Sequence, residues 1–232
     1  AIAGVQAIRV TPPLSKHSAY VGKTRLPDWV TFDRVVYLDA DTIVCGPLEQ
    51  LLESPLTITQ FADWQSLGRK IGGRIQWFRQ VKDSPRIQAM VDAQLAKSWP
   101  AINTGVMGWH KGGGWVAEWQ AIADAGAACV NMTDEIAMQL LFPGVDGHKV
   151  MDDRFNLSPI YGVHKSQAVV WHFHGDKHLR NSEGRHLWEP AFREAYDANV
   201  GGLREWAGRY DPWVRTLLAN PGAYSHGQAV HS

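Results

Sequence analysis

The sequence is poor in cysteine, has no excess of charge of either sign and contains no long apolar run. Its 232 residues include 2 cysteines, and 23 lysines and arginines balance 23 aspartates and glutamates. A balanced charge creates no global field that would recruit nucleic acid or an anionic membrane. No apolar segment approaches the roughly 20 residues of a membrane-spanning helix. We therefore expect neither a nucleic-acid partner nor a membrane span.

The start of the chain and its cysteines predict a cytoplasmic location. The segment AIAGVQAIRV at the N-terminus lacks the charged and apolar regions of a signal peptide. Cys45 and Cys129 could form one bridge, but Cys45 lies on an apolar stretch, which is typical of a buried free thiol in a reducing compartment. The chain also begins without Met, so we expect the true N-terminus to lie upstream.

Strand-like segments alternate with helical ones, which predicts an α/β protein with a mostly parallel sheet flanked by helices. The expected strands cover residues 4–10, 35–38, 56–62, 101–109, 148–153 and 168–175. The expected helices begin near Pro47, at Pro85 behind the capping Ser84, at Trp115 behind a glycine hinge, and at Thr133. Beyond these elements the sequence predicts a helical extension over 187–222 and a disordered tail over 223–232.

Two aspartates follow directly after the apolar run VVYL. On a strand, Asp39 and Asp41 would point to the same face and lie close together. Two carboxylates held that near each other repel unless a cation lies between them. Oxygen ligands of this kind suit Mg²⁺, Mn²⁺ or Ca²⁺. Because open α/β sheets bind ligands at the carboxyl ends of their strands, the pair predicts a metal site.

A second cluster of candidate ligands lies in WHFHGDKH, after the apolar residues AVV. His172 and His174 are two residues apart and would share one face of a strand, so the spacing permits either as a ligand. Gly175 allows close approach of the backbone. Two carboxylates and one imidazole would suit Mn²⁺ better than Mg²⁺, because nitrogen ligands favour Mn²⁺.

The segments YLDADT, INTGVM, DEIA and HFHG, in this order, resemble glycosyltransferase family 8, the glycogenin-like group of the GT-A fold. In that family a DxD motif and the histidine of a later HxxG motif hold Mn²⁺ against the diphosphate of a UDP-sugar. The resemblance implies that Asp39, Ala40 and Asp41 form the DxD motif. It also selects His172 as the third ligand of Mn²⁺ (or Mg²⁺), with Gly175 completing HxxG.

The resemblance implies further donor-binding residues. Lys23 stands where the family has a basic residue that approaches the donor, and Asn103 and Thr104 match a motif that contacts the donor sugar. Asp134 and Glu135 match an Asp-Gln pair beside the transferred sugar, with glutamate in place of glutamine. Acids in a first helical turn also complement the helix dipole, so a purely structural role for these two is an open alternative.

The late motif of the family, HFxGxxKPW, is only partly kept. Lys177 comes one residue earlier than the family's lysine, and His178 takes the lysine position. The resemblance makes Gly175 and Lys177 candidates for binding the donor. It also implies a catalytic domain over 1–186 that lacks the family's N-terminal nucleotide-binding βαβ unit, because little sequence precedes the DxD strand.

The resemblance implies a metal-dependent enzyme that moves a hexose from a UDP-sugar to an acceptor hydroxyl with retention of configuration. A haloacid-dehalogenase-like phosphatase also starts with a DxD strand, but it needs a threonine where this chain has Ile43. A glycoside hydrolase needs two carboxyl groups that flank a sugar bond, and no spacing in the sequence identifies such a pair. An inactive or truncated nucleotide-sugar- or carbohydrate-binding module is the remaining alternative.

Overall fold

The computed structural model describes residues 16–60, 75–97, 99–128, 133–158 and 168–173, together with the isolated positions 182, 190, 193, 194 and 197. For residues 16–19 the structure describes the backbone only. Three of the predicted segments lie outside the described residues: the strand at 4–10, the tail over 223–232 and, apart from those isolated positions, the helical extension over 187–222.

Helices and strands alternate along the described part of the chain, which confirms the predicted α/β class. The α-helices are α1 (Lys16–Lys23), α2 (Leu26–Trp29), α4 (Pro85–Ala96), α5 (Trp115–Gly126) and α6 (Thr133–Leu141). The strands are β1 (Arg34–Leu38), β2 (Thr42–Val44), β3 (Leu56–Gln60), β4 (Ile102–His110), β5 (His148–Met151) and β6 (Val170–His172). Short 3₁₀ helices are η1 (Glu49–Leu52), η2 (Phe78–Gln80), η3 (Phe142–Gly144) and η4 (Asp153–Asn156).

The strands form a four-stranded sheet in the order β1-β4-β3-β5 and a separate two-stranded sheet, β2-β6. Among the described strands, only β3 and β5 pair in parallel, while β1–β4, β3–β4 and β2–β6 are antiparallel. The expected predominance of parallel pairing is therefore wrong for these strands. That expectation came from the alternation of strands and helices. An apolar run such as VVYL shows that a strand is buried on both faces but does not determine the direction of its neighbours.

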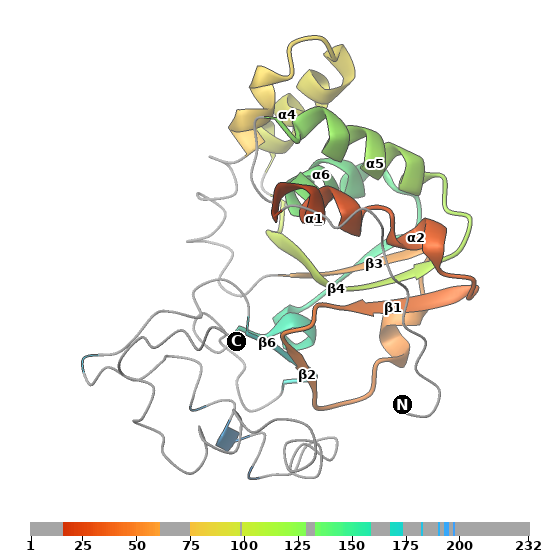
Figure 1. The fold of residues 1–232 in the computed structure, drawn as a ribbon, viewed down its shortest axis with the longest axis vertical. Coiled ribbons are helices and arrows are strands. Elements are labelled where there is room, and N and C mark those ends of the chain that lie inside the picture. Colours follow the sequence, from red (N-terminus) through yellow and green to blue (C-terminus); the bar gives the residue numbers. More distant parts are fainter. Residues whose placement is uncertain are drawn as a thin grey trace, which may run out of the picture.

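Both faces of the four-stranded sheet are covered. Figure 1 shows α1, α5 and α6 on one side and β2 and β6 on the other. Side chains along β1 alternate between the two sides: Val35 and Tyr37 pack against the larger hydrophobic core, and Val36 and Leu38 pack against the smaller one. This double burial explains why VVYL is apolar at every position.

One local prediction is confirmed and one is adjusted. Ser84 caps α4, because its hydroxyl accepts a hydrogen bond from the Ile87 backbone N–H. Cys45 is a free thiol, half-buried rather than fully buried, and burial raises its pKa. None of the described helices combines the length and the hydrophobicity needed to cross a lipid bilayer.

Gly108 on β4 permits the close packing of η1 on the sheet. A Cβ atom at this position would lie 1.8 Å from the carbonyl oxygen of Leu51. That oxygen is backbone and cannot rotate away. We expect Gly108→Ala to lower the free energy of unfolding by about 1–3 kcal/mol, the usual cost of overpacking. Gly144→Ala is the matched control, because no atom lies within 4 Å of its added Cβ. Urea denaturation in which both variants lose equal stability would contradict this packing.

Candidate functional site

The antiparallel pairing of β1 with β4 assembles the first half of the site. The end of β1 lies beside the beginning of β4, and the Asp39 backbone N–H donates to the Gly105 carbonyl at 2.7 Å. Asn103 and Thr104 therefore lie next to the DxD motif. Parallel pairing would have placed the same two residues at the opposite end of β1. The antiparallel direction of β4 is therefore required to place Asn103 and Thr104 beside Asp39.

The pairing of β2 with β6 assembles the second half. Thr42 stands opposite His172 in the register, and the Phe173 N–H donates to the Asp41 carbonyl at 2.9 Å. This register brings the His172 Nε2 atom to 3.2 Å from Asp41 Oδ1 and 3.6 Å from Asp39 Oδ2. Strand β1 ends at Leu38, so the two aspartates lie in the turn between β1 and β2 and not on the strand as expected.

Asp39, Asp41 and His172 offer three ligand atoms that all lie within 4.8 Å of one another. The imidazole is buried, with 1% of its side chain exposed, whereas the Asp39 and Asp41 side chains are 28% and 25% exposed. The carboxylates are therefore open to solvent on one side while the imidazole is fixed in the protein. Two carboxylates and one imidazole are a donor set that suits a divalent cation.

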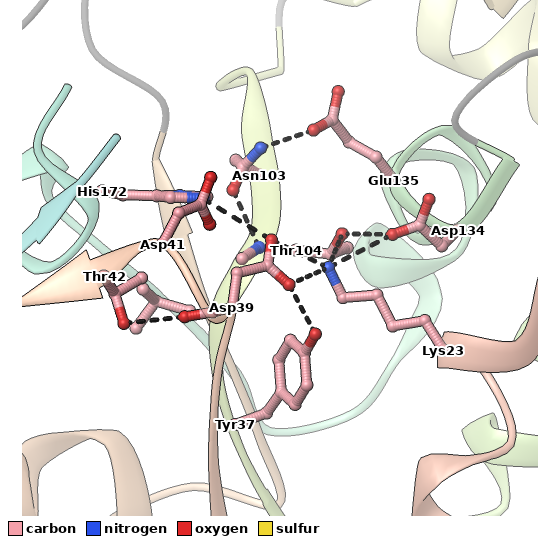
Figure 2. A network of polar contacts seen from close by, with 12 residues as sticks. Lys23, Tyr37, Asp39, Asp41, Thr42, Asn103, Thr104, Asp134, Glu135 and His172 are labelled. Atoms are coloured by element: carbon pink, nitrogen blue, oxygen red, sulfur yellow. Dashed lines mark hydrogen bonds and ion pairs between the residues drawn. The ribbon is translucent and has the colours of Figure 1, made fainter. Parts of the chain in front are cut away.

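Lys23, the last residue of α1, bridges the aspartate pair and α6 (Figure 2). Its Nζ atom lies 3.0 Å from Asp39 Oδ1 and 3.4 Å from Asp134 Oδ2. Burial alone would lower the pKa of Lys23, but the carboxylates of Asp134 and Asp39 outweigh it and hold this pKa above its ordinary value. The lysine is thus a fixed positive charge at the centre of the site.

Tyr37 supports the same aspartate from β1. Its hydroxyl donates a hydrogen bond to the Asp39 carboxylate, and the Lys23 ammonium lies 4.8 Å from the ring centroid. Burial, and then the negative charge of Asp39, raise the pKa of Tyr37. The phenol therefore stays protonated and acts as a donor, which orients Asp39.

The first turn of α6 supplies two further carboxylates, and both are buried. Thr104 Oγ1 donates to Asp134 Oδ2 at 2.7 Å, and Asn103 Nδ2 donates to Glu135 Oε2 at 2.6 Å. The second oxygen of Asp134, Oδ1, is buried without a hydrogen-bond partner. Both acids therefore contact the two residues of β4 that lie beside the DxD motif.

Gln139 and Asn156 support this arrangement, and the sequence prediction missed both. Gln139 lies one turn beyond Glu135 on α6; its Oε1 accepts from the Ile102 N–H at 3.0 Å and its Nε2 donates to the Pro100 carbonyl at 3.1 Å. This double contact fixes α6 against the start of β4. Asn156 is fully buried and contacts His172. The available signal was a polar residue between apolar neighbours, Phe155 and Leu157, where a buried amide needs partners.

The structure brings together eight of the residues predicted for the site, from four elements (α1, β4, α6 and β6) and the turn after β1. They are Lys23, Asp39, Asp41, Asn103, Thr104, Asp134, Glu135 and His172. Ala40 lies exposed in the turn between the two aspartates. Gly175 and Lys177 lie outside the described residues, as does His174, the alternative histidine.

No protein-family model matches the sequence, and no curated protein matches it. Three solved structures that align with the chain are glycosyltransferases. The galactosyltransferase LgtC, in complex with donor and acceptor sugar analogues, is 14% identical over 82% of this chain and 70% of that one, with a TM-score of 0.45. The bifunctional glycosyltransferase WbbM is 14% identical over 83% of this chain, with a TM-score of 0.46. GlyE of Streptococcus pneumoniae TIGR4 is 16% identical over 78%, with a TM-score of 0.41. This chain spans 37% of WbbM and 46% of GlyE.

The buried position of Lys23 generates a test of the site's electrostatics. Lys23→Met would leave the carboxylates of Asp39 and Asp134 without their cation, so we expect a loss of about 3 kcal/mol in the free energy of unfolding at neutral pH. Lys149→Met is the control, because Lys149 and Glu53 form an exposed pair whose loss costs less than about 1 kcal/mol.

The difference in the free energy of unfolding between wild type and Lys23→Met also depends on pH. The folded pKa of Lys23 is above its unfolded value, so its stabilising contribution is complete below about pH 10.4 and is lost as the pH rises through the folded pKa. Urea denaturation should show that this difference in unfolding free energy becomes smaller as the pH rises above about 10.4. A difference that stays constant throughout this alkaline range would contradict the ion pairs.

Proposed function

We propose that the protein is a metal-dependent glycosyltransferase of the GT-A type, resembling family 8, that transfers a hexose from a UDP-sugar to an acceptor hydroxyl with retention of configuration. The observation that carries the proposal is the convergence of Asp39, Asp41 and His172 on one point. These residues come from two of the four sequence motifs that resemble family 8, and the other two motifs contribute Asn103 and Asp134 beside them.

The charges of the site fit a divalent cation. Among the described residues, the site contains four carboxylates, those of Asp39, Asp41, Asp134 and Glu135, and one lysine, Lys23, so these residues together carry an excess of negative charge. Asp39, Asp41 and His172 would hold Mn²⁺ or Mg²⁺. A cation bound there would stabilise the negative charge of the diphosphate that leaves when the sugar–phosphate bond breaks.

The chain's own residues would assist at both ends of the donor. The Lys23 ammonium is fixed beside Asp39 and would add a second positive charge on the diphosphate side, with Lys177 as a further candidate. Asp134 has one oxygen held by Thr104 and one without a partner, and this second oxygen would accept a hydrogen bond from a hydroxyl of the sugar. Orientation of a reactant by fixed hydrogen bonds lowers the barrier to transfer.

Glu135 stands where family 8 has glutamine and is buried against Asn103. Its position one residue after Asp134 makes the pair the proposed catalytic residues, with Asp134 orienting the sugar and Glu135 adding negative charge on the same side. Negative charge near the reacting carbon stabilises the positive charge that develops on a sugar as its bond to phosphate breaks.

Metal binding is tested by thermal unfolding. A ligand present at about 100 times its dissociation constant stabilises the native state by about 2.7 kcal/mol, which corresponds to a rise in Tm of about 5–10 °C for a chain of this size. We expect Mn²⁺ to produce a rise of this order in wild type and almost none in Asp41→Asn. Asp92→Asn, at an exposed surface pair with Arg79, is the control and should respond as wild type does. An equal response in Asp41→Asn would refute the metal site.

Donor binding and turnover are tested together. We expect UDP to bind at least tenfold more tightly with Mn²⁺ than with a chelator in titration calorimetry, because the cation would join the carboxylates to the diphosphate. His172→Ala should lose Mn²⁺-dependent hydrolysis or transfer of UDP-sugars. UDP affinity that is indifferent to the chelator would reject this arrangement. Metal-dependent UDP binding without any turnover would identify a binding module instead of an enzyme.

A further inference from the structure

We propose that Asn156 is a positioning residue that fixes the ring of His172, so that Nδ1 is occupied by a hydrogen bond and Nε2 is directed at the two aspartates. The inference concerns the same site and, for its consequence on metal binding, rests on the proposed function. Its structural part concerns only the ring of His172 and can be measured without any metal.

The backbone places Asn156 beside His172. Asn156 ends η4, and the next residue, Leu157, forms a β-bridge with Trp171. The Leu157 N–H donates to the Val170 carbonyl at 2.9 Å, and the His172 N–H donates to the Leu157 carbonyl at 3.0 Å. These two bonds fix the segment against β6. The fully buried Asn156 side chain then meets the imidazole, with Oδ1 2.6 Å from His172 Nδ1.

The surrounding hydrogen bonds determine which end of the Asn156 amide faces the histidine. Its Nδ2 atom lies 2.7 Å from Thr59 Oγ1 and 3.3 Å from the backbone carbonyl oxygen of Asn103. A carbonyl can only accept, and the Thr59 hydroxyl already directs its proton at the carbonyls of Val106 and Asn103. The NH₂ group of Asn156 must therefore face these acceptors, which leaves its oxygen for His172.

The orientation of the amide determines the state of the imidazole. Since Asn156 Oδ1 can only accept, His172 Nδ1 must carry the proton of that bond. The lone pair required of a metal ligand is then available at Nε2, the atom that lies 3.2 Å from Asp41 and 3.6 Å from Asp39. A hydrogen bond on the outer nitrogen is the usual way in which a protein fixes the tautomer and the plane of a ligating histidine.

Gly105 of β4 also lies close to the ring. A Cβ atom on Gly105 would lie 2.0 Å from His172 Cε1 and 2.6 Å from Nδ1. The imidazole therefore packs directly against the β4 backbone at Gly105, where no side chain would fit. The ring is held by an amide at one nitrogen and by a backbone at one face, before any ligand binds.

The same network reaches α6. Asn156 Nδ2 also lies 3.0 Å from Asn103 Oδ1, which accepts from the Gly105 N–H at 2.8 Å. The Asn103 amide nitrogen donates in turn to Glu135. Asn156 is therefore the junction between the proposed metal ligand and the acid on the proposed sugar side.

The first experiment is nitrogen-15 NMR of the histidine rings in the metal-free protein, with the His172 signals assigned by their absence in His172→Ala. We expect Nδ1 of His172 to carry a slowly exchanging proton. An unprotonated Nδ1 would overturn the proposal whatever the behaviour of any variant. Asn156→Asp keeps an acceptor at the same place and should keep this proton, whereas Asn156→Leu, of similar volume, should lose it.

The second experiment is Mn²⁺ titration of wild type, Asn156→Leu and Thr59→Val, with folding checked by circular dichroism. Thr59→Val is the matched control: it removes one buried hydrogen bond from the same network, while the two Asn103 oxygens still accept from the Asn156 NH₂ group and keep Asn156 Oδ1 facing His172. Loss of an outer-shell partner typically weakens metal binding about 10- to 100-fold. We expect a loss of this size in Asn156→Leu and less than about threefold in Thr59→Val.

The outcomes separate this inference from the proposed function. If Asn156→Leu bound Mn²⁺ as tightly as wild type or as Thr59→Val does, the positioning role of Asn156 would be overturned. Absence of Mn²⁺ binding in wild type would overturn the proposed function. The NMR of the metal-free protein would still decide whether Asn156 fixes the tautomer of His172. If Asn156→Leu does not fold, the NMR of His172 Nδ1 in wild type and in Asn156→Asp still tests the proposal.

Discussion

The site depends on one electrostatic constraint: four carboxylates must lie close together in a partly buried environment. Like charges at such distances repel, and each carboxylate needs hydrogen bonds or a cation to remain ionised there. Lys23 neutralises part of this charge, and its contacts with Asp39 and Asp134 join α1 to the turn after β1 and to α6. The remaining negative charge is what makes the cluster of Asp39, Asp41 and His172 suitable for a divalent cation.

The supporting residues are as specific as the charged ones. Gln139 fixes α6 at the start of β4 through two backbone groups of residues 100–102, and Trp119 of α5 donates to the Asp134 carbonyl at 2.8 Å. The irregular pairing of β3 with β4 between Ile58 and Thr59 frees backbone carbonyls, which the Thr59 hydroxyl then satisfies. The hydroxyl thus supplies a donor for buried carbonyls at the point where the strand pairing is irregular.

Much of the local structure could be predicted from the sequence, because it depends on neighbouring residues. The cap of α4 at Ser84, the apolar strand before the aspartates and the acidic first turn of α6 are all present. Strand direction could not be predicted, since an apolar run is compatible with parallel or antiparallel neighbours. Gln139 and Asn156 were missed because one glutamine or asparagine in an apolar context shows that it needs a partner but not which one.

The sequence by itself determined which chemical groups are concentrated: two carboxylates behind a buried strand, a histidine behind another, and two acids at a helix start. Their spacing is a local property, and local geometry follows from the chain. Only the tertiary structure decided that these groups meet, because contact between segments far apart in the chain depends on strand direction and register. The antiparallel β1–β4 and β2–β6 pairs supply that register, and the hydrogen-bond partners buried between them determine which atom of each side chain faces the site.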